Sequence, residues 1–244
     1  MYYHYIFMFS DYEFGTRKAY YKTFQDVKKI KEFRDDIKQI KGDFKNISFS
    51  LHQIMTDSDK ISSVVEYDKY FKDVVFYSDK YEFQDELQLS TKITSSDILK
   101  YILIKKECTK LKALKLLYLI YEKYLKETGE FLFEEDFLAW EFGPVAKSAY
   151  SKLYAYKYSK IKLEDKTLEK AKLALKFDRI QNKEKIVECI DYIMLKYGEW
   201  QPEKLVDLTH EEERPWYKVK ENLGLGNSIT KEYMLDYVSS VNYI

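Results

Sequence analysis

The hydrophobic periodicity of the chain changes near residue 90, and this change restricts the folds that the sequence allows. Before it, residues 2–9 form an apolar run of strand length rich in Tyr and Phe, and residues 46–54 and 73–78 also favour β-strands. After about residue 92, apolar residues recur every three or four positions, which is the period of an amphipathic helix. The pattern predicts an α+β fold: a smaller α+β region at residues 1–90, followed by a mainly α-helical region at residues 91–244.

One helix is predicted inside the first region. Apolar side chains from Phe24 to Ile40 step by three or four positions along a segment rich in lysine and aspartate, which ends at Gly42. Glycine often ends a helix because it adopts the left-handed backbone conformation without strain. We therefore expect an amphipathic helix that stops at Gly42.

The second region contains the longest periodic run of the chain, TKLKALKLLYLIYEKYLKETG, at residues 109–129. It begins with Thr109, a residue type that caps helix N-termini well, and ends at Gly129. A second helix is predicted from the serine-rich start of residues 95–106. Further helices are predicted at residues 144–158, 164–175, 183–197, 201–208 and 230–238.

Gly143 and Pro144 stand side by side in the segment DFLAWEFGPVAKSAY, in a chain that has only 7 glycines and 3 prolines. Glycine can take a positive φ, and the fixed φ of proline suits the first turn of a helix. We therefore expect Gly143 to end the preceding segment and Pro144 to begin the helix at residues 144–158.

Composition excludes several classes of function. Lys+Arg and Asp+Glu number 41 each, so the chain lacks the net positive charge that draws proteins to nucleic acid, and a nucleic-acid partner is not implied. Cys108 and Cys189 are too few and too far apart for a disulfide framework or a CxxC metal site. No apolar run has the length of a membrane span, and the N-terminus lacks the features of a signal peptide. We expect a cytoplasmic protein with no membrane segment, no metal and no cofactor.

Three blocks of the sequence form a recognisable set: LKALKLLYLIYEKYL at 111–125, TGEFLFEEDFLAWEFGPVAKSAY at 128–150, and LVDLTHEEERPW at 205–216. In order and spacing this set resembles the Panacea domain of SocA-like antitoxins and their phage-associated relatives, over roughly residues 95–244. Residues 1–90 lie outside the resemblance. The motif positions, with a structural or partner-binding role, are Lys115, Tyr118, Asp136, Trp140, Gly143, Pro144, His210, Pro215 and Trp216.

The set departs from the usual family pattern at two places. Leu114 stands where the family usually has a glutamine, although the Lys115 to Tyr118 segment that follows is retained. The stretch from His210 to Pro215 is one residue longer than is common. Its three adjacent glutamates cannot all face one metal ion, so we interpret them as a solvent-exposed turn.

The resemblance implies an antitoxin that neutralises a partner toxin by direct stoichiometric protein binding, without enzymatic activity. An alternative is a phage- or prophage-encoded inhibitor of a host defence enzyme, which would also act by protein binding. A third hypothesis is a hydrolase built around His210, but the residues that follow that histidine are acidic and offer no nucleophile. We therefore predict an orienting or capping role for His210, and no catalytic or metal-binding residue.

Aromatic residues divide into predicted core and predicted surface positions. Tyr118, Trp140 and Phe142 are interpreted as core, since large aromatic side chains are usually buried. The 24 tyrosines are more than a core of this size can bury, because each hydroxyl needs a partner or water. The candidate partner-binding residues are Tyr2, Tyr3, Tyr5, Tyr20 and Tyr21, and a further dense group comprises Tyr150, Tyr154, Tyr156 and Tyr158.

Overall fold

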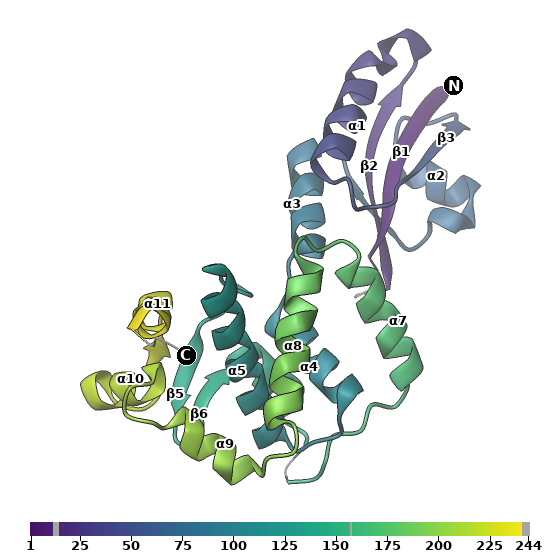
Figure 1. Cartoon of the computed structure of the whole chain (residues 1–244). Coiled ribbons are helices and arrows are strands. Elements are labelled where there is room, and N and C mark those ends of the chain that lie inside the picture. The colour runs from purple at the N-terminus through teal and green to yellow at the C-terminus, as the bar shows by residue number, and fades with distance from the viewer. Residues whose placement is uncertain (12–14, 157, 241–244) are drawn as a thin grey trace. The chain divides into compact units, whose positions relative to one another are not determined.

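The structure is a computed structural model that describes residues 1–11, 15–156 and 158–240, without the side chains of residues 27 and 28. The chain forms two compact units (Figure 1). The N-terminal unit comprises Met1–Lys92 and Ala174–Ile180, and the helical unit comprises Ile93–Leu173 and Gln181–Ile244. This arrangement confirms the predicted fold class, an α+β region followed by a mainly helical one.

The N-terminal unit is built on a four-stranded sheet. Its strands are β1 (Tyr2–Asp11), β2 (Thr16–Phe24), β3 (Ser50–Thr56) and β4 (Val74–Tyr77), in the order β3-β1-β2-β4. Strand β1 is antiparallel to both of its neighbours, whereas β2 and β4 are parallel. Strands pair with both edges of β1, so its two faces can be buried only by elements that pack above and below the sheet.

Both faces of β1 are covered by helices. The odd-numbered side chains of β1 pack with residues of α1 (Lys31–Asp43) and α3 (Lys80–Thr91). The even-numbered side chains pack with residues of α2 (Ser62–Tyr67) and of the 3-10 helix η2 (Lys69–Phe71). Burial on both sides explains why residues 5–9 of β1 are all apolar instead of alternating with polar residues.

The prediction for residues 16–42 was wrong in two respects. It missed β2 and assigned Phe24, the last residue of that strand, to a helix that in fact follows as η1 (Val27–Ile30) and α1. Lys18 obscures the strand pattern, because it is largely buried through ion pairs with Asp11 and Glu86 at 2.9 and 2.6 Å. Gly42 lies inside α1, which ends one residue later without a left-handed glycine.

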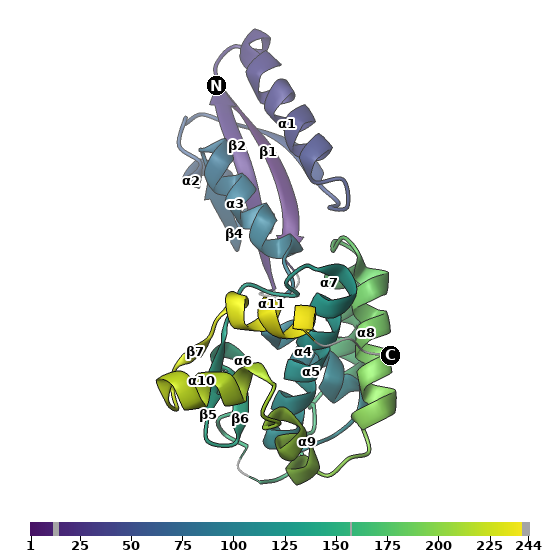
Figure 2. The ribbon, with the colours of Figure 1, turned by 60° about the vertical axis from the view of Figure 1, so that its left-hand side comes forward.

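Helix α5 (Lys110–Thr128) is the central element of the helical unit, and most of its side chains are buried. Its two ends lie where they were predicted: the Thr109 hydroxyl accepts a hydrogen bond from the Lys112 amide, and Gly129 follows with φ 72°. Around α5 pack several helices that Figures 1 and 2 show: α4 (Ser95–Lys105), α8 (Lys183–Tyr197), α9 (Pro202–Thr209) and α11 (Lys231–Ser240).

A small sheet and three further helices complete the unit. The sheet has the order β6-β5-β7, with strands β5 (Phe137–Trp140), β6 (Gly143–Ala146) and β7 (Ser228–Ile229). The helices are α6 (Lys147–Lys152), α10 (Pro215–Leu223) and the first part of α7 (Lys166–Phe177), whose residues from Ala174 onwards belong to the N-terminal unit. The bounds predicted for α8 are confirmed, and those for α7, α9 and α11 are off by one or two residues.

The prediction that Pro144 begins a helix was wrong. Gly143 has a positive φ of 100°, as expected, but Pro144 lies in β6, opposite Ala139 of β5, and the helix starts only at Lys147. Strand β6 is an edge strand, where the missing N–H of proline leaves no ladder bond unmade. Glu141 and Phe142 therefore form the turn of a β-hairpin.

We predict that residues 91–244 fold without the first 90 residues. Arg179, in the short segment that belongs to the N-terminal unit, donates a hydrogen bond to Ser10 O at 2.8 Å, so the fragment loses the partners of this segment. The fragment should retain a helical circular dichroism spectrum and a cooperative thermal transition. Replacing Phe177 and Ile180 by serine in it should improve its solubility, since both side chains are buried in the full chain.

Aggregation of both forms of the fragment would contradict this prediction. It would mean that the two units share one core and that the proposed division into residues 1–90 and 91–244 does not describe independent domains.

Candidate functional site

One face of α5 carries three polar side chains into the interior of the helical unit. Lys115, Tyr118 and Glu122 are spaced three and four residues apart, so they lie on the same side of the helix. Their exposed fractions are 0%, 0% and 7%. Together with the β5–β6 hairpin and the α9–α10 connection they form a cluster that we call the polar frame.

Lys115 joins α5 to the hairpin. Its Nζ donates a hydrogen bond to the carbonyl oxygen of Pro144 at 3.0 Å. Within the residues that the structure describes, no carboxylate forms an ion pair with this ammonium group. Burial lowers the pKa of Lys115 to about 7, because the interior disfavours the charged form.

Gly143 is required where Lys115 meets the hairpin. A Cβ atom at this position would lie 2.7 Å from Lys115 Nζ and 2.8 Å from Thr209 Oγ1, closer than real Cβ contacts. The φ of 100° is also a conformation that residues with a side chain rarely adopt. The glycine therefore serves both the turn of the hairpin and the close approach of α5 and α9.

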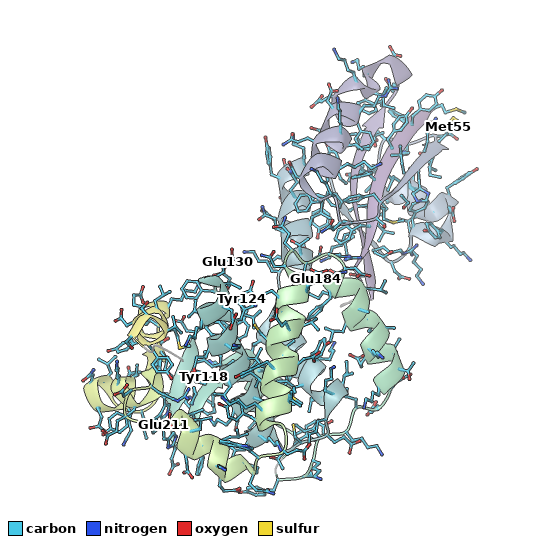
Figure 3. The ribbon with its side chains drawn as sticks, in the orientation of Figure 1. Met55, Tyr118, Tyr124, Glu130, Glu184 and Glu211 are labelled. Atoms are coloured by element: carbon cyan, nitrogen blue, oxygen red, sulfur yellow. The ribbon has the colours of Figure 1, made fainter. Side chains whose placement is uncertain are left out.

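Glu122 and Arg214 form a buried ion pair between α5 and the start of α10. Arg214 Nη1 donates to both carboxylate oxygens of Glu122, at 2.9 and 2.7 Å, and its Nε donates to Glu211 at 3.0 Å. Burial disfavours the charge of Arg214, but Glu122 outweighs this and raises the pKa of the guanidinium. Figure 3 shows Glu211 near the connection between α9 and α10, and Tyr118 within the helical unit.

Tyr118 packs as the sequence predicted, with no exposed surface. Its ring meets Phe137 edge-on at 5.1 Å, and its hydroxyl donates to Met234 Sδ at 3.7 Å. Burial and the nearby Glu122 carboxylate raise its pKa well above the usual value. The hydroxyl is therefore a hydrogen-bond donor inside the frame and does not ionise at neutral pH.

His210 and Trp216 hold the α9–α10 connection against the hairpin. Their rings stack in parallel, with centroids 3.5 Å apart. Trp216 Nε1 donates to the carbonyl oxygen of Trp140 at 2.8 Å, and Pro215 occupies the first turn of α10. The three glutamates at 211–213 are exposed in this connection, which confirms the predicted turn.

His210 is placed for packing. Its Nε2 is buried and has no hydrogen-bond partner among the described residues. Burial, together with the nearby Lys115 ammonium, lowers the pKa of His210 to about 4, so the ring is neutral at pH 7. In the described part of the chain, no three His, Cys, Asp or Glu side chains come together as a metal site requires.

The structure gathers most of the predicted motif residues into the polar frame, but Asp136 is used elsewhere. Its carboxylate accepts a hydrogen bond from Ser228 Oγ at 2.8 Å and so ties β5 to β7. The residues that the sequence prediction missed are Glu122, Thr209 and Arg214. Glu122 is a lone acid in an apolar run, and Arg214 is the only arginine after residue 179, so both left a signal in the sequence.

The N-terminal tyrosine candidates are less exposed than expected. Tyr5 and Tyr20 are 5% and 1% exposed and belong to the core between the sheet and α1, so the expectation that they lie at the surface was wrong. Tyr2, Tyr3 and Tyr21 are half-buried. The cause is the two-sided burial of the central strands, which places both alternating sets of side chains inside.

The hairpin forms one wall of a groove in the helical unit. Phe142, predicted to be core, is instead 61% exposed at the hairpin turn, and Trp140 is half-buried. The groove has a volume of 1090 Å³ and is mostly apolar. Its lining includes Leu111, Leu114, Trp140, Phe142, Val145 and Tyr150. Exposure of Tyr154 and Tyr158, at 74% and 94%, confirms that some tyrosines of that group are at the surface.

We predict that Lys115→Met changes the pH dependence of stability. The unfolded chain binds a proton at Lys115 up to about pH 10, whereas the folded chain releases it near pH 7, so the wild type gains stability as pH rises between these values. The methionine variant lacks this gain. Relative to the variant, the wild type should become more stable by about 2–4 kcal/mol between pH 7 and 10, measured by urea denaturation.

The matched control is Lys41→Met, which replaces an exposed lysine of α1 and should leave the pH profile unchanged. Parallel profiles for the wild type and Lys115→Met would show that Lys115 keeps its charge in the folded protein.

Comparisons with known proteins bear on the same segment of the chain. No curated protein and no solved structure matches it. In the described part of the chain, no helix has both the length and the apolar character of a membrane span. Residues 114–217 match the family described as "Antitoxin SocA-like, Panacea domain", which confirms the resemblance seen in the sequence motifs. The polar frame lies within these residues except for the contact to Met234, so the side chains that form it belong to the segment that is similar to the Panacea domain of SocA-like antitoxins.

Proposed function

We propose that this protein is an antitoxin that neutralises a toxin by direct, stoichiometric binding. The observation that carries this proposal is the family match over residues 114–217. Within that segment the motif side chains are directed at one another and build a scaffold. A scaffold of this kind leaves the surface around it free to vary, which suits a binding protein that must fit one particular partner.

The state of the polar groups supports binding over turnover. The Lys115 ammonium is bonded to a backbone carbonyl, the Glu122 carboxylate is paired with Arg214, and His210 is stacked on Trp216. A general base near neutral pH needs a pKa close to 7 and access to a substrate. The pKa of His210 is about 4, and Lys115 has no exposed surface.

We also propose that the N-terminal unit contributes to the choice of partner. Its main part, Met1–Lys92, lies outside the matched segment. This part presents apolar side chains to solvent, among them Tyr67 and Tyr81, at 73% and 67% exposure, and Met55 of the edge strand β3, labelled in Figure 3. Exposed aromatic side chains are frequent at the centres of protein interfaces. The proposal replaces Tyr5 and Tyr20 as candidates with these exposed residues and retains Tyr2, Tyr3 and Tyr21.

The test is co-expression of this protein with each of its neighbouring genes. We expect one neighbour to arrest growth when expressed alone and to be neutralised by this protein, with which it should co-purify at a fixed ratio. His210→Ala should also neutralise it, because the histidine packs against Trp216 and performs no chemistry. The variant should lose about 1 kcal/mol of stability with the ring stack, measured by thermal denaturation.

Loss of neutralisation by a folded His210→Ala protein, together with turnover of a substrate by the wild type, would contradict the proposal. If no neighbour is toxic and the protein instead binds and inhibits a defence enzyme, the alternative of a phage-encoded inhibitor replaces the antitoxin.

A further inference from the structure

The groove beside the hairpin has an apolar lining but an uneven distribution of charge around it. Two of its lining residues, Tyr150 and Tyr158, come from the stretch of chain that follows the hairpin. Between Glu141 and Glu164 this stretch contains five lysines and no acidic residue. Since the whole chain has no net charge, this is a strong local excess of positive charge.

Four lysines of this stretch, which we call the lysine wall of the groove, are available to a partner. Lys147, Lys152, Lys160 and Lys162 are exposed, and the structure shows no ion pair for them among the residues it describes. The wall is held beside the groove by the pairing of Lys160 with Thr109 and by the bond from the Ile161 amide to Cys108 O at 2.9 Å. Lys110, which lines the groove, lies over the ring of Tyr150 at 4.6 Å.

The N-terminus of α5 adds positive potential to the same groove. Thr109, Lys110 and the first turn of α5 line it, and this turn contains no acidic residue to offset the positive end of the helix dipole. The negative groups at the rim are Glu141 and Glu203, both exposed.

We propose that the groove between the α5 N-terminus, the β5–β6 hairpin and residues 147–156 and 158–162 binds an acidic segment of the protein partner, in which Asp or Glu residues alternate with apolar ones. The apolar residues fill the lining around Leu111, Trp140 and Phe142. The carboxylates meet the exposed lysines Lys147, Lys152, Lys160 and Lys162. This inference rests on the proposed function, because it assigns the chemistry of the partner that the antitoxin recognises.

Physical reasons favour this occupant over others. An apolar groove alone would accept many hydrophobic segments, but a basic segment would be repelled by the four exposed lysines, for which the described residues provide no ion pair. Nucleic acid would satisfy the lysines and stack on the tyrosines. It would not fill the aliphatic lining made by Leu111, Leu114 and Val145.

The experiment uses a displayed library of random dodecapeptides, selected on the immobilised full-length protein. Two variants distinguish peptides that bind in the groove from peptides that bind elsewhere on the protein. Phe142→Glu places a carboxylate at an exposed groove position, and Leu195→Glu places one at an 88% exposed position of α8, outside the groove lining. Both sites are exposed, so neither substitution should impair folding.

We expect peptides that bind the wild type and Leu195→Glu but not Phe142→Glu, and these should contain more Asp and Glu than Lys and Arg. A synthetic copy with Asn and Gln in place of its acids should bind roughly tenfold more weakly in fluorescence anisotropy, and binding of the acidic copy should weaken as salt is added. The absence of peptides sensitive to Phe142→Glu, or a neutral or basic composition of such peptides, would overturn the proposal. The proposal would also be overturned if a twelve-residue oligothymidylate bound the wild type more tightly than the acidic peptide does and failed to bind the Phe142→Glu variant.

Failure of this inference can be told apart from failure of the proposed function. If Phe142→Glu neutralises a toxic neighbour as well as Leu195→Glu does, the protein is an antitoxin but the groove is not its binding site. If acidic peptides bind the groove while no neighbour is toxic, the groove inference stands and the antitoxin assignment is withdrawn.

Discussion

The buried ion pair between Glu122 and Arg214 is the interaction on which the rest of the helical unit depends. It connects the middle of α5 to the start of α10, and both charges are almost fully removed from water. Removing two charges from water is costly, and only their mutual attraction at good hydrogen-bonding geometry offsets this cost. The ion pair fixes Arg214, and Trp216, two residues later, stacks on His210 and donates a hydrogen bond to the carbonyl oxygen of Trp140 in the hairpin.

Much of this fold could be predicted from the sequence because its helices are marked at their ends. Thr109 and Gly129 bound α5 by capping, a local property that needs no knowledge of the remainder of the chain. Strand β2 was hidden because Lys18 is buried by ion pairs with residues distant in sequence, and Pro144 was misread because its φ suits an edge strand as well as a helix. The motif residues could be named from the sequence, but the contacts that each of them makes depend on the tertiary structure, which no local pattern encodes.

The polar frame lies in the interior of the helical unit, whereas the groove lies at its surface. The frame uses its polar groups internally and fixes the hairpin, and Phe142 at the hairpin turn then projects into solvent. The sequence analysis interpreted Phe142 as core because most phenylalanines are buried. In the structure the hairpin turn instead holds this aromatic side chain exposed. Binding of a partner would bury this exposed ring, and this connects the fold to the proposed binding function.

The central claim is that the polar residues of the motif hold the scaffold together, and a double-mutant cycle on the ion pair tests it most directly. Urea denaturation of Glu122→Leu, Arg214→Met and the double variant gives the coupling energy. Arg214→Met leaves the buried Glu122 carboxylate without its cation and should lose about 3–5 kcal/mol. Glu122→Leu leaves Arg214 with the exposed Glu211 as its remaining carboxylate partner and should lose less, and the double variant should lose far less than the sum of the two single losses. Losses that add within about 0.5 kcal/mol would show that the two residues are not coupled and would contradict the account.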